Sequence, residues 1–243
     1  MKKMPVYLIN GFLGSGKTTL MLKLIKQLRE DDLKVAVVLN ELGQTNLERH
    51  MFSEENFYEL LNGCICCSIQ EDLKKVLEEL AGFFSKGEAD IAIIEGTGVA
   101  NPSEIHEIFT LSPFSQNFQL HASICITDVS MLRDYLSIYS SSKEVRNLQR
   151  QQIAHASHVV LNKKDLLEKN SELEKARKQV RKLNPTSNIY ETSYGSCIDE
   201  LLQTISSNNI DLKESPHVEP ALHKDIKAVK ISDINIQRAD INR

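Results

Sequence analysis

The chain has 243 residues, with 29 Lys and Arg against 33 Asp and Glu and a formal net charge of −4. Proteins whose obligatory partner is a nucleic acid usually carry an excess of basic residues, so this balance argues against such a partner. The contents of 41% hydrophobic and 26% charged residues are typical of globular domains and exclude the disordered and fibrous classes.

The first 40 residues predict a strand, a loop, a helix and a second strand. Residues 6–10 are apolar, residues 20–28 carry apolar side chains at helical spacing, and residues 33–39 form a β-branched run. This order is that of a parallel βαβ unit. The first strand and helix therefore place the loop between them at the carboxyl edge of a parallel sheet.

This loop, Gly11-Phe12-Leu13-Gly14-Ser15-Gly16-Lys17-Thr18, matches the P-loop pattern G-x-x-x-x-G-K-[ST] without a mismatch, and residues 11–18 are called the phosphate loop below. Its glycines let backbone N–H groups surround a phosphate, and the helix N-terminus adds positive potential. We expect Lys17 to reach the β- and γ-phosphate oxygens and the Thr18 hydroxyl to bind Mg²⁺. The predicted phosphate-binding residues are Gly14, Ser15, Gly16, Lys17, Thr18 and Thr19.

Three of the five cysteines lie within four residues, at Cys64, Cys66 and Cys67. In an extended segment Cys64 and Cys66 project to the same side, and three thiolates suit Zn²⁺ and other late metals with one coordination position left open. A redox dithiol and buried cysteines that act as small hydrophobic residues are the alternatives. Cys125, inside a predicted strand, and Cys197, at a predicted helix start, are interpreted as core residues.

A helix is predicted over residues 69–84, and a buried strand follows at residues 89–95. The strand ends in Glu95-Gly96-Thr97-Gly98, where P-loop proteins place an acidic residue near Mg²⁺. We expect Glu95 to hold a metal-bound water, and the amide of Gly96 or Gly98 to meet the γ-phosphate. A helix start is then predicted at Asn101-Pro102.

Further strands are predicted at residues 122–127, 158–161 and 188–191, with helices between them. The alternation predicts an α/β fold, a doubly wound and mostly parallel sheet with flanking helices. Residues 1–206 are interpreted as the P-loop domain, residues 207–224 as a linker, and residues 225–243 as a short C-terminal extension, the remnant or start of a further domain.

The strand at residues 158–161 leads into Asn162-Lys163-Lys164-Asp165, which has the pattern N-K-x-D and is called the base motif below. A carboxylate at Asp165 can accept from the N1–H and the exocyclic amine of guanine, whereas adenine has an acceptor at N1 and no amine at C2. Asn162, Lys163 and Asp165 are therefore predicted to bind guanine. Ser193, after the next strand, is a further candidate contact on the base side.

The membrane is not an expected partner, because no apolar run approaches the ~20 residues that cross a bilayer. The start of the chain only imitates a signal peptide, since Asn10 interrupts its apolar stretch and no small-residue cleavage site follows. An odd number of cysteines in a chain without an export signal also argues against a disulfide framework. We expect a cytoplasmic protein.

Several of these motifs together resemble the CobW family of GTPases over about residues 4–205. They are the phosphate loop, Asn40-Glu41-Leu42-Gly43, Asn62-Gly63-Cys64-Ile65-Cys66-Cys67, Glu95-Gly96-Thr97-Gly98 with Asn101-Pro102, and Gln152 ahead of the base motif. The resemblance implies a GTP-driven metallochaperone that binds a transition metal at the three cysteines and hands it to a client metalloprotein. Family members usually have Phe where Leu42 stands, Glu where Gln44 stands, and a second domain after the linker.

We therefore expect a Mg²⁺-dependent GTPase with Lys17, Thr18 and Glu95 in the catalytic role, and residues 40–67 as its switch. GTP and GDP, Zn²⁺ or Co²⁺, and a client metalloprotein are the expected ligands and partners, with a homodimer as a possible assembly. The alternative is an interaction module controlled by guanine nucleotides, whose cysteines sense redox state and bind no metal.

Overall fold

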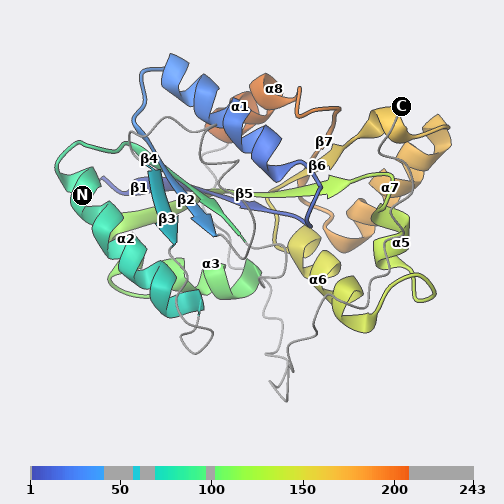
Figure 1. Cartoon of the computed structure of the whole chain (residues 1–243), viewed down its shortest axis with the longest axis horizontal. Coiled ribbons are helices and arrows are strands. Elements are labelled where there is room, and N and C mark those ends of the chain that lie inside the picture. The colour runs from blue at the N-terminus through green and yellow to red at the C-terminus, as the bar shows by residue number, and fades with distance from the viewer. Residues whose placement is uncertain (1, 41–56, 61–68, 97–101, 208–243) are drawn as a thin grey trace, which may run out of the picture. The chain divides into compact units, whose positions relative to one another are not determined.

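The strands of the computed structural model form one parallel sheet (Figure 1). The structure describes residues 2–40, 57–60, 69–96 and 102–207, and within these residues the sheet has 7 strands in the order β3-β2-β4-β1-β5-β6-β7. All six pairs of neighbouring strands run parallel. The strands are β1 (Met4–Asn10), β2 (Val35–Asn40), β3 (Phe57–Leu60), β4 (Ile91–Glu95), β5 (Phe118–Asp128), β6 (His158–Asn162) and β7 (Asn188–Glu191).

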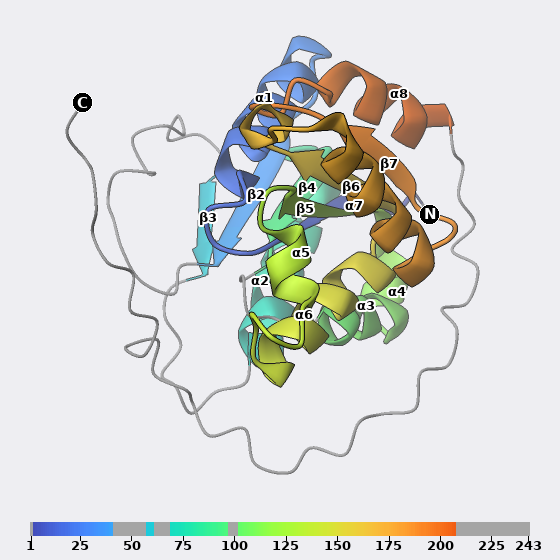
Figure 2. The same ribbon diagram turned by 90° about the vertical axis from the view of Figure 1, so that its right-hand side faces the viewer.

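Helices cover both faces of this sheet. They are α1 (Lys17–Glu30), α2 (Ile69–Ser85), α3 (Pro102–Thr110), α4 (Phe114–Asn117), α5 (Leu132–Leu136), α6 (Lys143–Ala154), α7 (Asn170–Leu183) and α8 (Ile198–Ser207), with a short 3₁₀-helix at Lys164–Leu166. Figures 1 and 2 show α1 and α8 on one side of the sheet, and α2, α3 and α6 on the other. Among the described residues, no helix is long and apolar enough to cross a bilayer.

The alternation of side chains along β1 explains why its sequence is apolar throughout. Tyr7 and Ile9 pack in the core that α1 and α8 cover, whereas Val6 and Leu8 pack in the core that α2 and α3 cover. A third core lies between β5, β6 and the helices α5, α6 and α7. Strands that are buried on both faces read as continuous apolar runs, and this is the pattern from which the sequence predicted them.

The predicted doubly wound α/β fold is confirmed, and the sheet is wholly parallel in its described strands. The prediction missed β3, an edge strand of 4 residues, and the short helices α4 and α5. It also shortened β5, which runs from Phe118 to Asp128 and contains an irregularity opposite Val6 and Tyr7. The chain divides into two units, Met1–Asp211 and Leu212–Arg243, and the second lies wholly outside the described residues.

Candidate nucleotide-binding site

The phosphate loop follows β1, the central strand, and ends where α1 begins. Gly11 has φ 149°, and a Cβ there would lie 2.2 Å from the backbone oxygen of Ile126 and 2.9 Å from Oγ of Ser15. Gly16 has φ 101°, and its Cβ would lie 2.3 Å from Nδ2 of Asn162. Glycine is therefore required at both positions, because the loop packs closely against β5 and against the base motif.

Lys17, the first residue of α1, lies beside Glu95 at the end of β4. Its Nζ is 3.2 Å from the carbonyl oxygen of Phe12 and 3.9 Å from Oε1 of Glu95. The Lys17 side chain is 9% exposed and the Glu95 side chain 14%. The two strands hold this arrangement, because Ile9 pairs with Glu95 and the Gly96 N–H donates to the Ile9 carbonyl oxygen at 2.8 Å. The structure thus brings Glu95 to the phosphate loop; Thr18 is half-buried and Thr19 exposed on the first turn of α1.

The base motif is bonded directly to the phosphate loop. Asn162 ends β6, and its Nδ2 donates to the backbone oxygen of Ser15 at 2.9 Å. Lys163 has the left-handed conformation, with φ 61°, which turns the chain from β6 into the 3₁₀-helix. The Lys164 N–H then donates to the carbonyl oxygen of Thr192 at 3.2 Å. The amide of Asn162 therefore fixes the two motifs relative to each other.

Asp165 and Ser193 lie on neighbouring loops, and a hydrogen bond joins the backbone of Asp165 to the side chain of Ser193. The Asp165 N–H donates to Oγ of Ser193 at 3.2 Å, and the Asp165 side chain is exposed. The Ser193 hydroxyl thus supports the main chain of the base motif, while the Asp165 carboxylate stays accessible from solvent.

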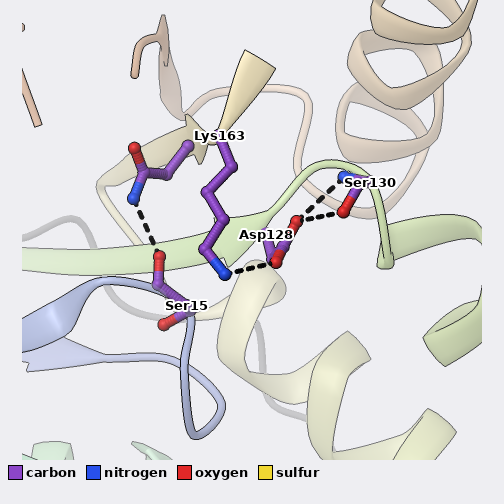
Figure 3. A network of polar contacts seen from close by, with 5 residues as sticks. Ser15, Asp128, Ser130 and Lys163 are labelled. Atoms are coloured by element: carbon purple, nitrogen blue, oxygen red, sulfur yellow. Dashed lines mark hydrogen bonds and ion pairs between the residues drawn. The ribbon is translucent and has the colours of Figure 1, made fainter. Parts of the chain in front are cut away.

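The sequence analysis did not single out Asp128, the last residue of β5. Its Oδ2 is 2.7 Å from Nζ of Lys163, and its Oδ1 accepts from the Ser130 hydroxyl at 2.6 Å and from the Ser130 N–H at 3.0 Å (Figure 3). An acidic residue that ends a buried strand, between the two motifs in the sequence, is the signal that could have identified it. The same signal did single out Glu95.

Each motif lysine is thus paired with a carboxylate at the end of a strand next to β1. Glu95 on β4 lies beside Lys17, and Asp128 on β5 lies beside Lys163. All four groups lie at the carboxyl edge of the sheet, which is where open α/β sheets bind their ligands. The carboxylates balance the two ammonium charges inside the protein.

Two aromatic rings connect the phosphate loop with α5. The ring centroids of Phe12 and Tyr135 are 4.8 Å apart. Burial raises the pKa of Tyr135, the Asp128 carboxylate raises it further, and the Lys163 ammonium lowers it. The phenol therefore lies within the electrostatic reach of the Asp128–Lys163 pair.

Several buried side-chain oxygens in and near the phosphate loop have no hydrogen-bond partner among the residues that the structure describes. They belong to Asn10, Ser15, Thr127 and Asn162. Buried polar atoms in native proteins are normally bonded to protein or to water. These oxygens thus indicate a site that a ligand or solvent completes.

The predicted thiolate site, Cys64, Cys66 and Cys67, lies outside the described residues, and so does Gly98. Within the part of the chain that the structure describes, no group of three or more His, Cys, Asp and Glu side chains is arranged to hold a metal ion. Cys125 and Cys197 are buried, as predicted for core residues. Burial raises the pKa of the Cys125 thiol to about 12.

Comparison with known proteins gives a family and several relatives. The model of the family described as "CobW/HypB/UreG, nucleotide-binding domain" matches residues 5–191. Zinc-regulated GTPase metalloprotein activator 1 of Schizosaccharomyces pombe is 32% identical over 203 residues, which cover 80% of this chain and 47% of the relative. Zinc chaperone YjiA of Escherichia coli is 27% identical over 220 residues, covering 88% of this chain and 65% of the relative. The chain thus spans about half to two thirds of the length of these curated relatives.

Solved structures agree with the fold. The crystal structure of Zn(II)-bound YjiA GTPase from E. coli has a TM-score of 0.57 and 26% identity, covering 78% of this chain and 57% of that one. The crystal structure of HypB from Helicobacter pylori in complex with nickel has a TM-score of 0.57 and 19% identity, covering 87% of this chain and 91% of that one. The second likeness concerns the fold alone.

Proposed function

The chain belongs to the family of CobW/HypB/UreG nucleotide-binding domains, and from this premise we propose that it binds GTP and hydrolyses it to GDP and phosphate. The observation that carries the proposal is the bond between Nδ2 of Asn162 and the backbone oxygen of Ser15 at 2.9 Å. It joins a motif suited to guanine and a loop suited to phosphates in one site. The names of relatives that are themselves GTPases support the same activity.

Guanine selectivity is assigned to the exposed carboxylate of Asp165. Two donors of guanine, N1–H and the C2 amine, match its two oxygens, and adenine offers neither. A site that binds through such donors rejects the analogue that lacks them, because its own polar group is then left unpaired. Ser193 holds the Asp165 backbone through the 3.2 Å hydrogen bond, which fixes the main chain from which this carboxylate projects.

In the proposed reaction a water molecule attacks the γ-phosphorus, and the bridging oxygen leaves with the β-phosphate of GDP. Lys17 would counter the negative charge on the β and γ oxygens, and its ammonium already lies at the phosphate loop, 3.2 Å from the Phe12 carbonyl oxygen. The loop N–H groups would hold the phosphates in place. Such catalysis rests on positioning and electrostatics more than on covalent chemistry.

The residues at the phosphate loop also fit Mg²⁺, a cation that prefers oxygen ligands. Thr18 follows Lys17 on the first turn of α1, and Glu95 lies within 3.9 Å of the Lys17 ammonium, so a hydroxyl and a carboxylate come from adjacent elements. Thr18 would bind the ion and Glu95 would hold one of its waters. When bound, the ion supplies further positive charge at the β- and γ-phosphate oxygens.

We assign a second ligand, a thiophilic transition metal, to Cys64, Cys66 and Cys67 as cargo that is delivered to a client metalloprotein in the cytoplasm. Thiolates prefer Zn²⁺ and other late metals, and three ligands leave a position open for transfer. The names of the relatives, zinc chaperone and zinc-regulated GTPase metalloprotein activator, support this class of function. Residues 1–206 would form the nucleotide-binding domain, and residues 207–243 the linker and extension.

Hydrolysis is tested with GTP and ATP on the chain and on its Lys17→Ala variant. The chain should turn over GTP and prefer it over ATP by well over tenfold, and Lys17→Ala should abolish turnover with an unchanged circular dichroism spectrum. Arg177→Gln is the matched control, because it also removes a positive charge from a helix of the same domain and lies outside both motifs. Equal use of ATP, or undiminished turnover in Lys17→Ala, would contradict the proposal.

Metal binding is tested separately, under anaerobic and reducing conditions. The chain should bind one Co²⁺ with a thiolate charge-transfer band, and Cys66→Ser should weaken that binding without weakening GTP binding in metal-free buffer. Cys125→Ser provides the control, because Cys125 is fully buried inside β5 and does not belong to the three-cysteine motif. Cysteines that oxidise to a disulfide and bind no metal would favour the redox-sensing alternative.

A further inference from the structure

The carboxylate of Asp128 is fixed on both of its oxygens. Oδ2 contacts the Lys163 ammonium at 2.7 Å, and Oδ1 accepts two hydrogen bonds from Ser130 (Figure 3). We propose that Asp128 is a positioning residue for guanine binding, which holds Lys163 and keeps the base motif in its binding conformation before the nucleotide arrives. The inference rests on the proposed function, because it assigns the base side of the same site.

Lys163 is a residue whose conformation needs support. Its φ of 61° places it in the left-handed region, which is unfavourable for a side chain with a Cβ. It lies between Asn162, which is bonded to the phosphate loop, and the loop that carries Asp165. A lysine side chain also has many rotamers, and an ion pair with a fixed carboxylate selects among them. Asp128 thus restrains the motif at its most strained position.

The pair is more protected from solvent than an ordinary surface ion pair. The Asp128 side chain is 11% exposed and the Lys163 side chain 34%, against 23% and 52% for Glu191 and Arg177, an ion pair between β7 and α7. Partly buried pairs are screened less by water and salt than exposed ones, and an ammonium–carboxylate contact at 2.7 Å is a charge-assisted hydrogen bond. The Asp128–Lys163 contact therefore contributes more than a solvated pair of the same charges.

Backbone hydrogen bonds join β5 and β6 around Asp128. Asp128 pairs with Asn162 in the register of β5 and β6, and the Val129 N–H donates to the Asn162 carbonyl oxygen at 3.0 Å. Asp128→Asn keeps the size of the side chain and an acceptor oxygen for Ser130, and it puts an uncharged amide NH₂ in place of the oxygen that accepts from the Lys163 ammonium, so the ion pair is lost. The substitution leaves Glu95 beside Lys17 on the other side of β1. The effect of Asp128→Asn therefore falls on the base motif and not on the phosphate loop.

The test measures the Kd for GDP, and kcat and KM for GTP, in the full chain and in Asp128→Asn, Lys163→Gln and the double variant. Asp128→Asn should raise the Kd and the KM by about 5-fold to 30-fold, with kcat unchanged within about twofold, because base binding is equal in the ground and transition states. The double variant should match Lys163→Gln alone, since Asp128 acts through that lysine. Ser130→Ala should also raise the KM, by a smaller factor than Asp128→Asn. Arg177→Gln is the control and should change none of these three constants.

The outcomes separate this inference from the proposed function. A full chain that does not bind GDP would contradict the proposed function itself. GDP binding by the full chain, with the same Kd and KM in Asp128→Asn, would overturn only the role of Asp128, and so would additive effects of Asp128→Asn and Lys163→Gln. Should Asp128→Asn fail to fold, judged by thermal unfolding, Ser130→Ala decides, and an unchanged KM in that variant overturns the inference.

Discussion

Replacing Gly16 by Ala should disrupt the contact between the phosphate loop and the base motif. The added Cβ would lie 2.3 Å from Nδ2 of Asn162, so the amide must move away from the backbone oxygen of Ser15, to which it now donates at 2.9 Å. The left-handed conformation at φ 101° costs an Ala about 1–2 kcal/mol. Separating the buried amide from its acceptor costs about 1–3 kcal/mol more.

Gly14→Ala is a matched control within the same loop. Gly14 has φ 75°, and a Cβ there would meet no atom within 4 Å, so this variant bears the backbone cost without the clash. Gly82→Ala, in the helix α2, meets no atom within 4 Å either and is not at a positive φ. It should stabilise the protein by about 0.5–1 kcal/mol.

The assay is urea unfolding of the nucleotide-free protein together with the Kd for GDP. Gly16→Ala should be less stable than Gly14→Ala by about 1–3 kcal/mol, and it should bind GDP more weakly. In an Asn162→Ala background Gly16→Ala should be no less stable than Gly14→Ala, because the amide that would clash with the new Cβ is gone. Equal stabilities of the Gly16 and Gly14 variants would refute the close approach that the structure shows.

Three further predictions concern specificity, coupling and pH. Asp165→Asn should shift nucleotide preference from guanine toward xanthine, whose C2 carbonyl needs a donor, as competition between GDP and XDP would measure; unchanged preference would remove Asp165 from the base site. If the metal and the nucleotide are coupled, the Kd for Co²⁺ should differ about 5 to 150-fold between a non-hydrolysable GTP analogue and GDP, and equal values would exclude the coupling. Burial lowers the pKa of both His106 and His158 from 6.5 to about 4, so the unfolded chain binds more protons than the folded one between these values. Stability is therefore full above pH 6.5 and falls as the pH drops toward 4, by at most about 1.4 kcal/mol per pH unit for each histidine, and His106→Asn should flatten the urea-unfolding profile over this window.

Long elements with a strong period could be predicted from the sequence, and short or distant features could not. The apolar residues of α1 recur over the whole helix, whereas β3 has only 4 residues and follows a stretch without any period. Tertiary pairing, which a local pattern does not contain, places β3 at the edge of the sheet.

The site residues divide in the same way. The phosphate loop and the base motif each carry their chemistry in consecutive residues, so both could be read from the sequence. The partners of these residues are distant in the chain, as with Asn162 and Ser15 or Lys163 and Asp128. Ser193 illustrates the difference, because its hydrogen bond with the Asp165 N–H joins two loops distant in the chain and was not part of the sequence prediction, whose base contact stays a prediction.

The central position of β1 also bears on how the protein folds. Val6 pairs with Ala92 on one side and with Leu120 on the other. Both partner strands of β1 therefore lie far from it in the sequence. Contacts so distant in sequence form slowly, because a long loop must close before they contribute. Because the phosphate loop packs against Ile126 and Asn162, we expect it to reach its native conformation only after β5 has paired with β1 and β6 with β5. We therefore expect bound nucleotide to slow the unfolding of the native protein and to leave its folding rate unchanged.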